Sequence, residues 1–283
     1  MTWSLTVAGT VCLDDVTTPA GRRTEQQGGS AVFAALAAAP RVPVHLVAVV
    51  GEDGVASMDA ALAGTDVDRT GLVIAPGRTR RWRAVHDFER WVTATEESDE
   101  GACDDWEPSV PATAAAAEVL FLGSMAPHQQ LAVLAASRAR LVASDTMTVH
   151  IADDAERVWR VVEASHVVFL NRSELAALTG IAEASWREAA AGLIGRGRVR
   201  AVVVKAGPLG AAVVTADGIV EREAHPVGAV VDPTGAGDSV AGAMLAHCAL
   251  AERDDAAAVV AALDAGLARA AQAIGAFGTD GLR

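Results

Sequence analysis

Short apolar runs recur along this chain, and the segments between them are long enough to hold helices. Each run is continuously apolar rather than alternating, which is typical of strands that are buried on both faces. Strands of this kind form parallel sheets whose connections place helices on both sides. We therefore predict an α/β fold of three layers, with a mostly parallel central sheet built from residues 5–7, 44–50, 119–122, 141–143, 167–170 and 199–204.

The end of the chain departs from this parallel pattern. Residues 211–215 and 219–223 flank Asp217-Gly218, a pair that is typical of a tight turn between antiparallel strands. We therefore expect the sheet to end in an antiparallel hairpin. Two alanine-rich helices are expected to close the chain, over residues 236–250 and 255–274.

Length and composition favour one domain that spans residues 1–283, because 283 residues with 51% hydrophobic content can bury a substantial core. The net charge of −13 argues against nucleic acid and anionic membranes as partners, since both attract clustered positive charge. No apolar run is expected to be long enough to cross a bilayer, and we expect a cytoplasmic protein. Three cysteines without C-x-x-C spacing indicate neither a disulfide framework nor a zinc site.

Residues 231–239 read V-D-P-T-G-A-G-D-S and combine a glycine turn with the start of a helix. Gly235 and Gly237, with Ala236 between them, allow the backbone amides to turn inward, and the helix start adds its positive dipole end. The segment therefore predicts an anion site. Asp238 places a carboxylate where a bound phosphate alone would disfavour one, which indicates a chemical role. The structural alternative is that Asp238 only accepts hydrogen bonds from free amides at the helix start.

Two better-known phosphate motifs are disfavoured. The chain has no G-x-x-x-x-G-K-[ST] sequence, and Val240 stands where the third glycine of G-x-G-x-x-G would be. Neither a Walker-type NTPase nor an ordinary dinucleotide-binding fold is therefore indicated.

The string D-P-T-G-A-G-D-S resembles the signature of the ribokinase or PfkB family of carbohydrate and nucleoside kinases, and other segments resemble that family's motifs in the same order. Residues 5–14 look like its first strand, which ends in an aspartate, here Asp14, that holds substrate hydroxyls. Residues 28–31 resemble the glycine pair that starts the first helix. Residues 171–174 are similar to its N-x-x-E motif, and residues 202–210 to its nucleotide-flanking strand and turn. The resemblance spans residues 5 to about 279.

This resemblance implies a ribokinase-like fold and an ATP-dependent phosphotransferase that acts on an alcohol hydroxyl. Asp238 would be the general base, and the backbone of Gly235, Ala236 and Gly237 would hold the transferred phosphate. The remaining nucleotide-binding residues would be Lys205, Gly207, Gly210, Thr234, Asn171, Phe277 and Gly278.

The same resemblance implies metal ions. Glu174 would hold Mg²⁺ through water, together with Asn171, and Asp232 beside Thr234 is a candidate for binding K⁺. Two structural alternatives stay open. Asn171 is also well placed to cap a helix, and Lys205, the only lysine of the chain, would equally suit an ion pair with a nearby carboxylate.

The expected partner is a small polyhydroxylated substrate, contacted by Asp14, Gly28, Gly29, Ser30, Phe33, Trp82 and Asp145. A small sugar or polyol is the first choice. Cys12 and Phe33 stand where asparagines often touch the sugar in the family, so a ribose-like set of contacts is not indicated. Nucleosides and cyclitols therefore stay open as alternatives, as does a ligand sensor that has kept the fold and lost turnover.

Residues 15–27 and 78–107 correspond to a small β lid over the substrate in the family. The second segment carries Trp82, Trp91 and Trp106 among several arginines. We expect at least two of these tryptophans to pack the lid on the body and the third to stack on substrate. The arginines are expected to be mostly solvated, and single histidines such as His86 to have surface or capping roles. Dimerisation through the lid is a further expectation.

Overall fold

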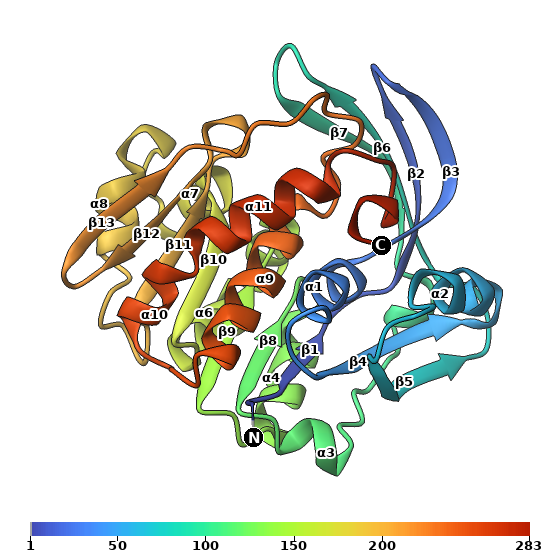
Figure 1. Ribbon diagram of the computed structural model, residues 1–283, viewed down its shortest axis with the longest axis horizontal. Helices are drawn as coiled ribbons and strands as arrows, with labels where there is room; N and C mark the ends of the chain where they lie inside the picture. The colour runs from blue at the N-terminus through green and yellow to red at the C-terminus, as the bar shows by residue number, and fades with distance from the viewer. Residues whose placement is uncertain (1) are drawn as a thin grey trace.

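The computed structural model describes residues 2–283, and in this part of the chain a nine-stranded sheet lies between two layers of helices (Figure 1). The strand order is β13-β12-β11-β10-β9-β8-β1-β4-β5. All neighbouring strands from β11 to β5 pair in parallel, while β12 and β13 are antiparallel. The expectation of a mostly parallel sheet with helices on both faces is confirmed, and so is the antiparallel hairpin at its end.

The central strands are β1 (Leu5–Ala8), β4 (Val44–Gly51), β5 (Asp68–Ala75), β8 (Val119–Leu122), β9 (Leu141–Asp145), β10 (Val167–Asn171), β11 (Ala201–Lys205), β12 (Ala211–Thr215) and β13 (Gly218–Arg222). Strand β5 was not predicted from the sequence. This edge strand is only partly buried, so it lacks the continuous apolar run that marks the others.

The α-helices are α1 (Ser30–Ala38), α2 (Val55–Ala61), α3 (Ala112–Ala115), α4 (Pro127–Ala136), α5 (Thr148–Asp153), α6 (Ala155–Ala164), α7 (Arg172–Thr179), α8 (Trp186–Ala191), α9 (Ala236–Leu250), α10 (Ala256–Ala261) and α11 (Leu263–Ala273). Short 3₁₀ turns are η1 (Glu52–Gly54), η2 (Gly101–Cys103), η3 (Glu183–Ser185), η4 (Gly207–Leu209) and η5 (Asp280–Leu282).

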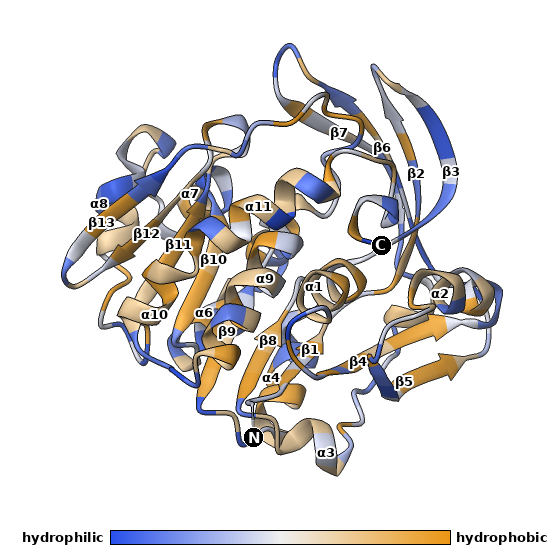
Figure 2. Cartoon of the chain, viewed as in Figure 1, coloured by the Kyte–Doolittle hydropathy of each residue, from blue (hydrophilic) through white to orange (hydrophobic). Residues whose placement is uncertain are grey.

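The core lies on both faces of the sheet, as the apolar colouring of the strands in Figure 2 reflects. Phe121 and Phe169 belong to the cluster under α1, α9 and α11, whereas their neighbours Leu120 and Val168 belong to clusters on the opposite face. This alternation explains the continuous apolar runs, because successive side chains of a strand point to opposite faces. Helices α1 and α9 pack closely, and a Cβ at Gly242 would overlap the backbone of α1 at Ala34.

The last expected helix is divided in two. The N–H of Ala262 is shared between the carbonyls of Ala258 and Val259, and this local tightening separates α10 from α11. Residues 256–273 are also long and apolar enough to cross a bilayer by length and composition, so the expectation that no such stretch exists was wrong. Several of these residues, among them Val259, Leu263 and Leu267, belong to the main core, as expected for a core helix of a folded domain.

A second sheet of four strands, in the order β3-β2-β6-β7, projects from the body beside α1 (Figure 1). Its strands are β2 (Cys12–Thr18), β3 (Gly21–Gly28), β6 (Arg80–Asp87) and β7 (Val92–Asp99), which lie mainly in the two segments where a lid is predicted. Residues 5–14 are therefore not one strand: β1 ends at Ala8, and Asp14 belongs to β2 of the second sheet.

Candidate active site

Two cavities meet at the glycine turn that precedes α9. The first, about 440 Å³ in volume and called here the β6 cavity, is lined by residues of β2, β6 and α1 and by Thr234, Gly235 and Asp238. The second, also about 440 Å³ and called the α11 cavity, is lined by residues of α11 and of the loop after β13, and by Pro233, Ala236 and Gly237. Residues of the same turn therefore line both cavities.

The turn has the geometry that the sequence predicts for it. Gly235 has left-handed backbone angles (φ 74°) and directly precedes α9, and Gly237 lies in the first turn of that helix. The hydroxyl of Ser239 donates to the carbonyl oxygen of Gly235 over 2.8 Å and holds the turn against the helix. The first N–H groups of a helix have no partner within it, so they are available to an anion at this position.

Asp238 lines the β6 cavity at the start of α9. Burial raises the pKa of its carboxyl group to about 7, and the nearby Asp145 also raises it, while Lys205 acts in the opposite direction. A carboxylate that titrates near neutral pH is suited to accept a proton from an alcohol.

Lys205 forms an ion pair with Asp145, with 2.5 Å between Nζ and Oδ2. Burial lowers the pKa of Lys205, but Asp145 and Glu174 outweigh this effect and raise it overall, so the side chain stays charged. The ion-pair alternative is therefore present in the structure. Lys205 nevertheless also lines the α11 cavity, beside Gly237. Asp145 was expected to contact the substrate, but its carboxylate accepts hydrogen bonds from Lys205 and from the N–H of Thr146.

Asn171 and Glu174 form a capping box at the start of α7. Asn171 Oδ1 accepts from the N–H of Glu174 over 2.8 Å, and Glu174 Oε2 accepts from the N–H of Asn171 over 2.7 Å. The capping alternative for Asn171 is thus what the structure contains. Burial raises the pKa of Glu174 to about 7; Lys205 lowers it and Asp145 raises it.

Asp232 connects the glycine turn to the chain end. Its Oδ1 accepts from the N–H of Thr234 over 2.9 Å and its Oδ2 from the N–H of Gly278 over 3.2 Å.

His86 Nε2 lies 3.1 Å from the hydroxyl of Thr234. His86 is buried rather than at the surface, and burial lowers its pKa. The guanidinium carbon of Arg23 lies over the ring of Phe277, 5.1 Å from the ring centre.

The residues predicted for the nucleotide are only partly brought together. Lys205, Gly207 and Gly210 line the α11 cavity. Thr234 lines the β6 cavity instead, and Asn171, Phe277 and Gly278 are not among the residues that line either one.

The residues predicted for the substrate are mostly brought together. Asp14, Gly29, Ser30, Phe33 and Trp82 all line the β6 cavity. Gly28 contributes by its lack of a side chain, because a Cβ there would overlap the Asp14 carboxylate. Burial raises the pKa of Asp14 to about 7, against the lowering effects of a hydrogen bond from Cys12 and of the Arg80 charge.

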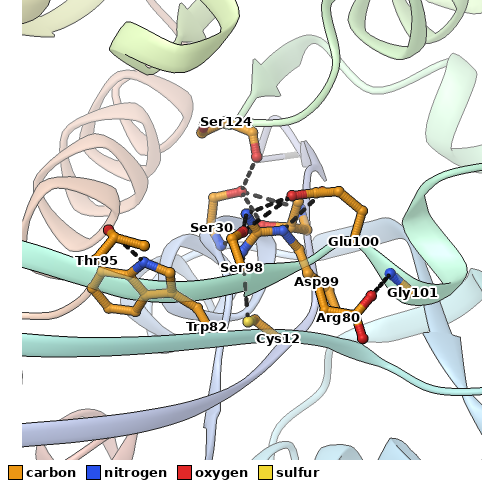
Figure 3. Close-up of polar contacts among 11 residues, drawn as sticks. Cys12, Ser30, Arg80, Trp82, Thr95, Ser98, Asp99, Glu100, Gly101 and Ser124 are labelled. Carbon is orange, nitrogen blue, oxygen red and sulfur yellow. Dashed lines mark hydrogen bonds and ion pairs between the residues drawn. The ribbon is translucent and has the colours of Figure 1, made fainter.

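Several polar residues of the β6 cavity were not predicted from the sequence, above all Arg80, Ser98 and Glu100 (Figure 3). Arg80 alternates with Trp82 and His86 on β6, and side chains two apart on a strand share a face, so this spacing was the available signal.

Two of the three tryptophans contact the body as expected, and the third lines the cavity that holds the predicted substrate residues. Of the three, only Trp106 belongs to the core; Trp82 lines the β6 cavity and Trp91 the α11 cavity. Trp91 has a positive φ of 54° in the β6–β7 connection, and its indole lies beside Gly207 of the body.

Solved structures of several kinases share this fold. A fructokinase of Vibrio cholerae O395, solved with fructose, ADP and calcium, matches with a TM-score of 0.79 at 21% identity and covers 99% of this chain and 96% of that one. An aminoimidazole riboside kinase of Salmonella enterica matches with a TM-score of 0.78 at 20% identity, covering 99% and 96%. The nucleoside kinase of Methanocaldococcus jannaschii matches with a TM-score of 0.72 at 21% identity, covering 98% and 93%.

At the level of sequence, a curated cytidine kinase of Thermococcus kodakarensis is 30% identical over 250 residues, which cover 86% of this chain and 87% of that protein. The family model for the pfkB family carbohydrate kinases matches residues 3–282. This match covers nearly the whole chain, and the solved structures above share its fold. The chain belongs to the pfkB family of carbohydrate kinases.

Proposed function

We propose that this kinase transfers the terminal phosphoryl group of ATP to an alcohol hydroxyl of a small polyhydroxylated substrate, with Asp238 as the general base. The observation that carries this proposal is the position of the turn 233–238, whose residues line both the β6 cavity and the α11 cavity. A phosphoryl donor in one cavity and an acceptor in the other would meet there, and phosphoryl transfer depends mainly on such positioning.

ATP fits the α11 cavity better than the β6 cavity. Leu267, Ala271 and Ile274 offer apolar surface to a flat ring, while Lys205 and the amides of the glycine turn offer positive charge to phosphates. Lys205 would neutralise part of the developing phosphate charge, and its ion pair with Asp145 would keep the ammonium in place.

The acceptor hydroxyl would lie beside Asp238 in the β6 cavity. Asp238 would accept the hydroxyl proton as the oxygen attacks the phosphorus atom, and the amides of Gly235, Ala236 and Gly237 would stabilise the transferred group. Asp14 would hold neighbouring hydroxyls, because its buried carboxylate lines the same cavity and Gly28 leaves space for it.

Magnesium fits this site through the nucleotide. Within residues 2–283 there is no group of three or more His, Cys, Asp or Glu side chains arranged to hold a metal ion. Mg²⁺ retains water readily and is often held mainly by substrate phosphates, so outer-sphere help from Glu174 would suffice. When bound, the ion supplies neutralising charge at the phosphate oxygens.

A role for Asp232 in binding K⁺ is not needed to explain why a carboxylate is present there, because both of its oxygens already accept backbone hydrogen bonds.

Among the acceptor classes, a nucleoside is now favoured over a small sugar. Besides Asp14, the β6 cavity is lined by Trp82 and Arg80 of β6, which provide an aromatic surface and polar groups suited to a base. The cytidine kinase that is 30% identical to this chain supports the same choice. The second sheet would then act as a lid that carries the contacts to the base.

Two wider expectations stay predictions. Strand β7 is exposed along nearly its whole length, which supports dimerisation through the edge of the second sheet. A cytoplasmic location is in keeping with a small-molecule kinase.

The proposal is tested by measuring ADP release from ATP and Mg²⁺ with a panel of nucleosides, sugars and cyclitols. We expect acceptor-dependent ADP release that is highest with a nucleoside. A sensor on this fold would instead bind ATP and an acceptor without releasing ADP, and that result with every acceptor of the panel would contradict the proposal.

A further inference from the structure

Arg80 and Glu100 form a fixed polar pair in the wall of the β6 cavity (Figure 3). Arg80 Nε donates to Glu100 Oε2 and its Nη2 donates to Oε1, both over 2.9 Å. Ser98 Oγ accepts from Nη2 over 3.2 Å, and the Sγ of Cys12 lies 3.7 Å from Nη1. The Arg80 side chain is 14% exposed, so the guanidinium is held on several sides and presents one orientation to the cavity.

This pair keeps hydrogen-bonding capacity for a ligand. A guanidinium has five N–H donors, and the contacts of Arg80 with Glu100, Ser98 and Cys12 leave one of them on Nη1. A carboxylate has about four lone-pair positions. Two donors of Arg80 and the hydroxyl of Ser98 occupy three of these positions on Glu100. Glu100 remains 44% exposed on the side chain, in the cavity wall. One donor of Arg80 and one acceptor position of Glu100 therefore remain for a ligand.

Apolar surface for a flat ring lies next to this pair. Trp82 stands two residues from Arg80 on β6, so the two side chains share a face of the strand about 7 Å apart. The indole Nε1 donates to Thr95 Oγ1 over 3.0 Å, which fixes the ring at the cavity wall. Met147 and Val149 line the same cavity and are 38% and 48% exposed.

Residues on one face of β6 follow one another along the cavity towards the glycine turn. His86, six residues beyond Arg80 on the same face, contacts Thr234 at the glycine turn. Arg80 therefore lies at the end of the strand face that is remote from the turn, with Trp82 between them. A substrate whose hydroxyl reaches Asp238 would direct its opposite end to Arg80 and Glu100.

We infer that Arg80 and Glu100 select a nucleoside whose base carries an exocyclic amino group beside a ring-nitrogen acceptor, as cytosine and adenine do. This inference rests on the proposed function and assigns the substrate class of the same site. The amino group would donate to the Glu100 carboxylate, and Arg80 would donate to the acceptor of the ring. Bases with a carbonyl oxygen in place of the amino group, as in uracil and hypoxanthine, would place that oxygen against the carboxylate and be rejected.

The test compares kcat/KM for two pairs of nucleosides that share a sugar, cytidine with uridine and adenosine with inosine. We expect the amino member of the accepted pair to be preferred by about 10-fold or more, because one charge-assisted hydrogen bond is gained and one repulsion avoided. In Glu100→Gln the preference should fall by about 10-fold or more, mainly through KM, since a glutamine amide can donate to a carbonyl oxygen as well as accept from an amino group.

Glu97→Gln is the matched control. It makes the same change three residues away, at an exposed carboxylate that pairs with Arg83 over 2.8 Å and does not line the cavity. Its preference should equal that of the unchanged protein. Arg80→Lys is a second variant in case Glu100→Gln does not fold: it keeps the charge, loses the planar fork and should likewise lower the preference.

The outcomes separate this inference from the proposed function. Equal rates with amino and carbonyl bases, activity with sugars alone, or a preference that Glu100→Gln leaves unchanged would overturn the inference and leave phosphoryl transfer standing. If no acceptor releases ADP, the proposed function fails. Calorimetric titration of cytidine and uridine, adenosine and inosine would then decide the inference: tighter binding of the amino members that Glu100→Gln abolishes supports it, and equal binding contradicts it.

Discussion

Gly235 lies against the ring of Phe33 so closely that a Cβ on this glycine would overlap the ring carbons Cγ, Cδ1 and Cδ2. Phe33 comes from α1 and is 1% exposed, so it cannot move aside without disturbing the core. Gly235 also has a positive φ of 74°, a conformation that side chains disfavour. The position of the glycine turn between the two cavities thus depends on a residue that is far away in sequence.

Gly235→Ala should therefore lower both stability and activity. We expect a loss of about 2 kcal/mol or more in unfolding free energy, because overpacking adds to backbone strain, and a fall in kcat of about 10²-fold as the amides shift. Gly64→Ala is the matched control, since Gly64 has φ 78° with open space around it. It should cost only about 1 kcal/mol and leave kcat unchanged. Chemical denaturation and steady-state kinetics measure both effects, and equal losses in the two variants would contradict this account.

Lys205→Met removes the ammonium from a group of carboxylates. The variant leaves Asp145 buried without its ion-pair partner, so we expect a loss of about 3 kcal/mol in unfolding free energy at pH 8 and weaker ATP binding. Arg187→Met breaks an exposed pair with Glu221 and should cost less than about 1 kcal/mol. Denaturation and ATP titration of both variants check this. An unchanged ATP affinity in Lys205→Met would contradict the proposal that this residue binds the phosphates of ATP.

Trp82 and Trp91 should affect different substrates, because they line different cavities. We expect Trp82→Ala to raise KM for the acceptor by about 10-fold with little change for ATP, and Trp91→Ala to do the reverse, since each stacked ring contributes about 1–3 kcal/mol. Each variant is the control for the other. Initial rates with each substrate varied in turn measure the effect, and a parallel loss in both KM values would count against two separate sites.

Asp238 should make the stability of the ligand-free protein depend on pH. Its pKa is raised by burial from an ordinary value of 3.8 to about 7, so the folded state holds this proton more tightly than the unfolded state. The contribution is present below about pH 4 and is lost as pH rises through 7. The variant Asp238→Asn has no titrating carboxyl group at this position, so its stability does not fall for this reason as pH rises. Its stability relative to the unchanged protein should rise by about 1–2 kcal/mol between pH 4 and pH 8, less than the full shift implies because the side chain keeps some access to solvent.

Denaturant unfolding across this pH range tests the sign. Asp14 and Glu174, whose pKa values are also raised to about 7, remain in both proteins. Because the charge of Asp238 helps to raise the pKa of Glu174, its removal lessens the loss of stability at Glu174, and this effect has the same sign as the predicted difference. A difference between the two proteins that is constant with pH, or that falls as pH rises, would contradict the assigned pKa.

The strands and the glycine turn were predictable because local pattern determines them. Continuous apolar runs mark strands buried on both faces, and Gly235 and Gly237 mark a turn that only glycine adopts readily. Strand β5 was missed because it lies at an edge and is exposed on one side. The break between α10 and α11 was missed because Ala262 is no helix breaker in sequence.

The side-chain partners were not predictable in the same way, because they depend on contacts between distant segments. Arg80 reaches Cys12 only through the parallel pairing of β2 with β6, and a solvated arginine was the natural expectation for a segment with so many. Lys205 and Asp145 are 60 residues apart, on β11 and β9. Hydrogen bonds to Asp232 from Thr234 and Gly278 likewise became visible only in the fold.

The most direct test of the account is the turnover of Asp238→Asn with the best acceptor from the panel. The substitution keeps the shape of the side chain and removes the base. We predict a fall in kcat of at least about 10²-fold, equivalent to roughly 2.7 kcal/mol of barrier, with ATP affinity largely retained. A variant that turns over at nearly the rate of the unchanged protein would contradict the central claim.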